Sequence, residues 1–193
     1  MNKMNKTYIQ DKNFKDKNFS KNPILKAEYD NCTFTNCVFN NTNLSNFSFE
    51  ECRFEDCDLS NSTIINTAFK DVQFVNCKLI GLQFDECNPF LLSFSFSNCQ
   101  LNYSSFFKLK IPNTKFNNCI LQEIDLTESN LSGSDFIECD FTGAIFGRTN
   151  LEKVDFRTSF GFSYDLEANR VKGAKFSLEN LPGLLNNYEI EID

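Results

Sequence analysis

The chain has 193 residues, no histidine and no tryptophan, and its 26 acidic and 19 basic side chains give a net charge of −7. Without histidine the chain lacks the usual general base and the commonest zinc ligand, so we expect a protein that is not an enzyme and needs no cofactor. Its acidity disfavours direct binding to nucleic acid, so we expect no nucleic-acid partner. No apolar run reaches the roughly 18 residues of a membrane span, and the first residues lack the apolar core of a secretory signal, so we expect a cytoplasmic protein with no membrane partner.

The first 11 residues precede the regular pattern described next and are predicted to form an N-terminal arm. Seven lysines and two aspartates lie within residues 1–26, which makes this end of an acidic chain basic. The arm is interpreted either as a solvated segment or as a contact to an acidic partner.

From residue 12 to about residue 158, a large apolar residue recurs at every fifth position. This period fits neither a helix nor a flat strand, so the chain must turn once per repeat and direct every apolar centre to a common interior. The residue two places after each centre is usually Asn, Asp or Gly, which tolerate turn dihedrals. The pattern predicts a coil of short edges joined by corners.

Comparing residues 20 apart gives the number of edges in one coil. One column is phenylalanine throughout, with a single step of 22 between Phe74 and Phe96. Four edges per coil, with a two-residue bulge near Pro89, explain both spacings. The predicted core column runs through Phe34, Phe54, Phe74, Phe96, Phe116, Phe136 and Phe156.

The nine cysteines lie two residues before an apolar centre, or before the position where one is due. A small side chain is needed beside the large centre, and cysteine behaves as a compact buried hydrophobe. Their spacing, without histidine, is a poor zinc pattern, and their odd number disfavours a disulfide framework. Six fall on one predicted core column, namely Cys37, Cys57, Cys77, Cys99, Cys119 and Cys139.

These repeats resemble the pentapeptide-repeat family, through units such as Cys57-Asp58-Leu59, Ser134-Asp135-Phe136 and Thr149-Asn150-Leu151. The resemblance covers residues 12–158. It implies an all-β fold, a right-handed quadrilateral β-helix, which is a pentapeptide-repeat solenoid. Fold alone does not imply an activity.

Residues 159–193 are predicted to form a C-terminal cap and dimerisation segment. Asn180 is suited to cap a short helix with Pro182 in its first turn. The apolar side chains of this segment either cover one open end of the coil or also form a two-fold homodimer, and we favour the dimer. The candidate interface comprises Leu181, Leu184, Leu185, Tyr188, Ile190 and Ile192.

The tail from Tyr164 to Ile192, with Lys172-Gly173-Ala174-Lys175-Phe176 and Pro182-Gly183-Leu184-Leu185, is similar to the ending of Qnr-type quinolone-resistance proteins. That resemblance implies a homodimer that binds a type II topoisomerase, DNA gyrase or topoisomerase IV, as an acidic DNA mimic. It also implies fluoroquinolone resistance without any catalytic step. The alternative is a structural scaffold for an unknown protein partner.

Residues 27–152 carry 17 acidic and seven basic side chains, a net charge of −10. We interpret this charge as a DNA-mimicking surface, and a solubilising coat is the alternative. The candidate topoisomerase-binding residues are Glu28, Asp30, Glu50, Glu51, Glu55, Asp56, Asp71, Glu123, Asp125, Glu128, Asp135 and Glu138.

Overall fold

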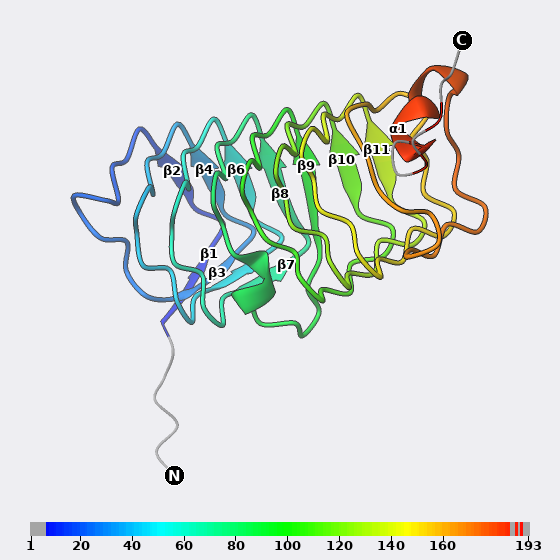
Figure 1. The fold of residues 1–193 in the computed structure, drawn as a ribbon. Helices are drawn as coiled ribbons and strands as arrows, with labels where there is room; N and C mark the ends of the chain where they lie inside the picture. Colours follow the sequence, from blue (N-terminus) through cyan, green and yellow to red (C-terminus); the bar gives the residue numbers. More distant parts are fainter. Residues whose placement is uncertain (1–6, 186–187, 189, 191–193) are drawn as a thin grey trace.

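The computed structural model describes residues 7–185, 188 and 190. The chain winds into a stack of four-sided coils, and a short helix closes the C-terminal end (Figure 1). The predicted quadrilateral β-helix with a C-terminal helix cap is therefore confirmed. Its sides are so short that each strand has only three or four residues.

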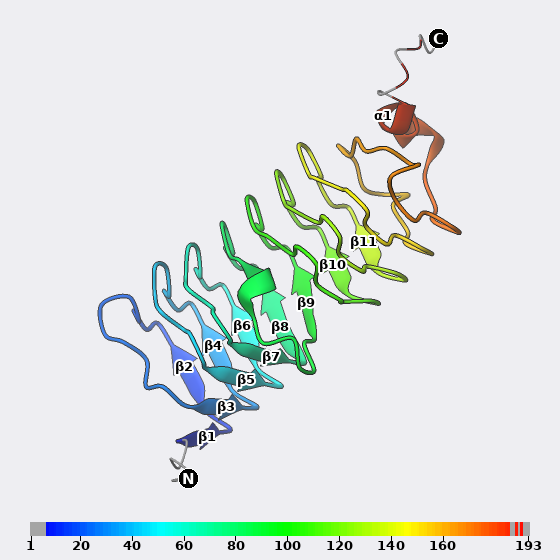
Figure 2. The same cartoon turned by 60° about the horizontal axis from the view of Figure 1, so that its bottom comes forward.

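Two parallel sheets form two sides of the coil, and Figure 2 shows their strands stacked along the rod. The first sheet contains β1 (Tyr8–Gln10), β3 (Glu28–Asp30), β5 (Ser48–Glu50) and β7 (Ala68–Lys70). The second contains β2 (Asn13–Lys15), β4 (Thr33–Thr35), β6 (Arg53–Glu55), β8 (Val72–Val75), β9 (Phe94–Ser97), β10 (Lys115–Asn117) and β11 (Asp135–Ile137). Single bridges such as Val38↔Asp58 and Asn43↔Thr63 join the coils on the other sides.

The strand register agrees with the sequence spacing. Phe14 pairs with Phe34, 20 residues later, and Phe74 pairs with Phe96, 22 residues later. The extra two residues leave the coil as the segment from Asn88 to Ser93, which rejoins it where Ser93 N–H donates to the Phe69 carbonyl at 3.0 Å. The bulge therefore leaves the core column unbroken.

The phenylalanine column is a stack of rings along the rod axis. Neighbouring rings are nearly parallel, with centroids 4.7 Å apart for Phe34 and Phe54 and 4.7 Å apart for Phe116 and Phe136. Every member of the two predicted core columns, phenylalanine and cysteine, is at most 2% exposed. Full burial of one phenylalanine contributes up to about 3 kcal/mol relative to exposure.

The cysteine slot satisfies the backbone as well as filling space. All nine cysteines are buried and unpaired. Cys57 Sγ lies 3.3 Å from the carbonyl oxygens of both Phe34 and Glu55, which share its single S–H donor. Thr67 and Thr149 occupy equivalent slots and donate to Leu44 and Leu126 at 2.7 and 2.9 Å. A small inward side chain with a donor therefore suits the slot, although apolar side chains such as Phe47 and Leu82 fill it at other positions.

The corners have left-handed backbone dihedrals, as their Asn, Asp and Gly residues indicate. Asn36 and Asn76, for example, have φ of 51° and 54°. Glu86 is an exception, because it ends the 3-10 helix η1 (Phe84–Glu86) rather than a corner of this kind. Beyond the bulge, Tyr103 and Lys108 adopt φ of 60° and 59° although neither is a typical turn former. The register of the stacked coils imposes the corner there.

Backbone pairing between coils extends beyond both predicted ends of the solenoid, residues 12 and 158. Strand β1 pairs with β3 within the segment predicted as the arm, while residues 1–6 lie outside the described residues. At the other end Asp155 bridges to Lys175, and the Phe176 ring stacks on Phe156 at 5.5 Å. The cap proper comprises the 3-10 helix η2 (Leu178–Asn180) and α1 (Pro182–Leu185). No helix in the described part of the chain has the length and apolar character needed to cross a membrane.

Candidate protein-interaction surfaces

Four predicted carboxylates meet where the first sheet turns into the second. Asp30 and Glu50 are register partners on β3 and β5, and Glu51 and Asp71 occupy left-handed corner positions with φ of 51°. Successive coils are about 4.8 Å apart, so these side chains form a row along the rod. We call Asp30, Glu50, Glu51 and Asp71 the acidic corner.

Several contacts hold this row in place. Tyr8 donates its hydroxyl to Asp30 at 2.5 Å, Lys70 pairs with Glu50 at 3.2 Å, and Ser93 donates to Asp71 at 2.8 Å. The hydrogen bond to the Asp30 carboxylate raises the pKa of Tyr8 to about 12, because it stabilises the protonated phenol. Glu51 is exposed and has no side-chain partner among the described residues.

The other predicted acids of the N-terminal half lie elsewhere. Glu28 begins β3, whereas Asp30 ends it, so the two belong to opposite corners of one sheet. Glu55 pairs with Arg53 at 3.1 Å on the second sheet. Asp56 accepts from Asn76 Nδ2 at 3.0 Å at the corner that follows. The structure therefore separates Glu28, Glu55 and Asp56 from the acidic corner.

The acids beyond the bulge are distributed over several sides, and many have structural contacts. Glu128 pairs with Arg148 at 2.6 Å and Lys108 at 3.6 Å, and the Arg148 hydrogen bond lowers its pKa. Asp125 accepts from the Thr127 N–H at 2.9 Å. Asp135 is on β11, and Glu123 and Glu138 occupy corners with φ of 54° and 53°. They do not form one surface with the acidic corner.

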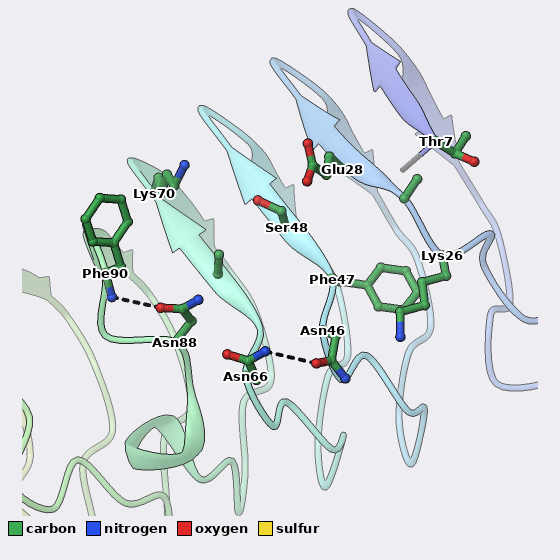
Figure 3. A pocket seen from close by; sticks show the side chains of 12 residues that line it. Thr7, Lys26, Glu28, Asn46, Phe47, Ser48, Asn66, Lys70, Asn88 and Phe90 are labelled. Carbon is green, nitrogen blue, oxygen red and sulfur yellow. Dashed lines mark hydrogen bonds between the residues drawn. The ribbon is translucent and has the colours of Figure 1, made fainter. Parts of the chain in front are cut away.

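A groove that the sequence did not indicate follows the opposite corner of the first sheet (Figure 3). It encloses about 840 Å³ and is lined by residues including Lys26, Asn46, Phe47, Ser48, Asn66 and Phe90. We call it the corner groove. The usable sequence signal was Phe47, a large residue in a column that holds Ala27, Thr67 and Cys87 on the neighbouring coils. Only the stacking of coils shows that these residues share one hollow.

The candidate dimer residues differ in exposure. Leu181, Tyr188 and Ile190 are 37%, 47% and 55% exposed, whereas Leu184 is 2% exposed in the core of its own chain. Leu184 therefore seals the solenoid and is not part of an exposed interface. Leu185 is half-buried, and Ile192 lies outside the described residues. Leu178, which is not among the predicted interface residues, is the most exposed apolar side chain among the described residues of this end, at 85%.

Comparisons with known proteins identify the repeat. Residues 27–106 match the family model described as pentapeptide repeat region, and residues 119–157 match the model described as pentapeptide repeats in 8 copies. A search of curated proteins gives no match.

Two solved structures share the fold over most of their length. A trypsin-treated variant of QnrB1, a plasmid-mediated fluoroquinolone resistance protein, is 19% identical with a TM-score of 0.58, covering 96% of this chain and 100% of that chain. HetL, a pentapeptide repeat protein involved in heterocyst differentiation regulation from the cyanobacterium Nostoc sp. strain PCC 7120, is 14% identical with a TM-score of 0.70, covering 89% and 87%. Identities this low show a shared fold alone.

Proposed function

Since this chain belongs to the pentapeptide-repeat family, we propose that it is a non-catalytic protein that binds DNA gyrase or topoisomerase IV in place of DNA. The acidic corner is the contact surface. No bond is made or broken in this mechanism, because the carboxylates occupy the basic surface that otherwise holds DNA phosphates. Such a partner requires a cytoplasmic protein.

The spacing of the acidic corner supports this proposal. Asp11 lies at the same corner as Glu51 and Asp71, one coil before Asn31, and extends the row to five carboxylates over four coils. At about 4.8 Å per coil, this is about one carboxylate per 4 Å, against one charge per about 1.7 Å along duplex DNA. The row therefore has about half the linear charge density of DNA on a rigid support.

The rigidity of that support also favours binding. Strands β3 and β5, which carry Asp30 and Glu50, each pair in parallel with a neighbouring strand on both sides. Little conformational entropy is lost when an already ordered surface binds, so more of the electrostatic attraction contributes to affinity.

The test is gyrase supercoiling activity measured with titrated protein, with and without a fluoroquinolone. We expect inhibition or protection that the double variant Glu50→Lys, Glu51→Lys weakens by at least about tenfold. The matched control is Glu123→Lys, Glu138→Lys, which changes net charge equally at two exposed corners outside the acidic corner and should weaken the effect by less than about threefold.

Equal loss in both double variants would show that only net charge matters and would contradict the choice of surface. No effect of the wild-type protein in either arm would favour the alternative, a scaffold for another protein partner.

We also propose that the protein is a two-fold homodimer through its C-terminal end. The support is the apolar surface of Leu178, Leu181, Tyr188 and Ile190, which remains exposed after Leu184 has closed the core. An interface at this end would remove these apolar side chains from water.

A further inference from the structure

The corner groove runs along the rod axis, across the starts of β1, β3, β5 and β7 (Figure 3). Its floor contains Ala27 and Phe47, which are 6% and 5% exposed. Corner asparagines form one wall, and Asn66 Nδ2 donates to Asn46 Oδ1 at 2.9 Å. Ser48 and Ala68, adjacent on β5 and β7, form the other wall. The hollow is thus apolar below and hydrogen-bonding at its sides.

Phe47 creates this floor by departing from the repeat. On the neighbouring coils that line the groove its column holds the smaller residues Ala27, Thr67 and Cys87. Its ring lies nearly parallel to those of Tyr29 and Phe49, with centroids 6.3 and 6.0 Å away. These contacts fix the ring in one position, so the floor is preorganised for an apolar side chain.

The bulge forms the far end of the groove. Phe90 and Leu91 are 68% and 62% exposed, and Leu91 has φ of 56°, a conformation that a bulky side chain rarely adopts. The Phe90 N–H donates to Asn88 Oδ1 at 3.0 Å, which orders the turn. An ordered, strained turn that presents an exposed apolar side chain, that of Phe90, beside a hollow is typical of a binding surface.

Charge distinguishes the corner groove from the acidic corner. Two lysines, Lys26 and Lys70, line it, and Glu28 is its single acid. Lys26 has no ion pair within the described part of the chain, whereas Lys70 is held by Glu50. Asp30 and Glu50 lie at the other end of the same strands, so the first sheet separates the acidic corner from the groove, where Lys26 is the cation without an ion pair among the described residues.

We propose that the corner groove binds an extended acidic segment of a partner protein, with one large apolar side chain held between Phe47 and Phe90. A carboxylate of the segment pairs with Lys26, and its polar backbone groups meet Asn46, Asn66 and Ser48. From Lys26 to Phe90 the groove crosses about three coil spacings, about 14 Å, which an extended chain spans with four or five residues at about 3.3 Å each. This site does not depend on topoisomerase binding.

The probe is a phage-displayed library of random heptapeptides selected on the wild-type protein. We expect enriched peptides to combine at least one Asp or Glu with a large apolar residue. Synthetic fluorescent copies should bind wild-type protein in anisotropy titrations. The variant Ser48→Arg, which puts a long side chain into the groove without touching the core, should weaken that binding by at least about tenfold.

Two further variants test whether the loss of peptide binding is specific to the corner groove. Thr35→Arg adds the same charge on β4 of the second sheet, opposite Glu55 in register, and should change affinity by less than about twofold. Phe90→Ala, at an exposed position, should weaken binding by about fivefold or more without altering the circular dichroism spectrum.

Several outcomes would overturn the proposal. These are no enriched peptide, enrichment of basic peptides, or binding that Ser48→Arg leaves unchanged. Binding that appears only after deletion of residues 1–6 would show that the chain's own N-terminal segment is the occupant. Gyrase inhibition that persists in Ser48→Arg, with peptide binding lost, would show that the two surfaces are independent.

Discussion

The Cys57 thiol donates to the carbonyl oxygen of Phe34, 23 residues earlier in the chain, at 3.3 Å. The Ser159 hydroxyl has the same relationship to Phe136, at 2.9 Å. Inward thiols and hydroxyls such as these therefore connect many of the coils to the one before, in addition to the backbone ladder. The slot accepts Cys, Ser or Thr because each combines small volume with a donor.

Substitutions at Cys57 should separate volume from hydrogen bonding. Cys57→Ser keeps a donor of the kind found at Ser159, so it should lower the free energy of unfolding by less than about 1 kcal/mol. Cys57→Ala loses both the donor and buried volume and should cost about 1–3 kcal/mol. Urea unfolding followed by circular dichroism measures both values. Equal costs would mean that volume alone matters in this slot.

Thiol chemistry should depend on unfolding. Burial raises the pKa of Cys52 from 9.0 to about 12 by disfavouring the thiolate. Native protein should therefore react with a thiol reagent at far below the rate of urea-unfolded protein, which should expose all nine thiols.

The same raised pKa predicts a pH dependence of stability. The folded state retains its proton longer than the unfolded state, so this contribution is complete below pH 9 and is lost as the pH rises toward 12. Urea midpoints should fall across this interval. A midpoint that stays constant up to pH 11 would contradict thiol burial as the cause.

A substitution at Gly81 tests whether the corners require a left-handed backbone conformation. Gly81 has φ of 72°, and an added Cβ would lie 2.6 Å from Asn61 Oδ1 on the neighbouring coil. Gly81→Ala should lower the free energy of unfolding by about 1–3 kcal/mol through strain and this clash.

Gly147 provides the matched control for Gly81. It has no left-handed φ, and an added Cβ would meet only Thr127 Cγ2, at 3.7 Å. Gly147→Ala should therefore change stability by less than about 1 kcal/mol. Thermal unfolding of both variants decides whether corner geometry, rather than glycine itself, is required.

The proposed homodimer predicts a concentration-dependent mass. Leu178 and Leu181 are 85% and 37% exposed, so Leu178→Glu, Leu181→Glu should dissociate the dimer without unfolding the chain. Sedimentation velocity should show wild type as a dimer and the variant as a monomer. Ile65→Glu, at another exposed apolar position, should remain dimeric. A monomeric wild type would contradict the proposal.

The fold could be predicted in unusual detail because the spacing of the apolar residues directly reflects its structural repeat. Phe74 and Phe96 gave the 22-residue step, and the structure pairs them in register. Corners such as Tyr103 were harder to predict from residue type, since stacking on neighbouring coils imposes their dihedrals.

The surfaces required the three-dimensional structure. The sequence determined the five-residue period, four sides per coil and the inward direction of the phenylalanines and cysteines, because those depend on neighbours along the chain. Only the tertiary structure decided that Asp30 and Glu50 join Asp71 while Glu28 does not, and that Phe47 and Phe90 share a groove. The reason is that residues from successive coils form each surface, and the shape of that surface depends on the direction in which each side chain extends from its coil.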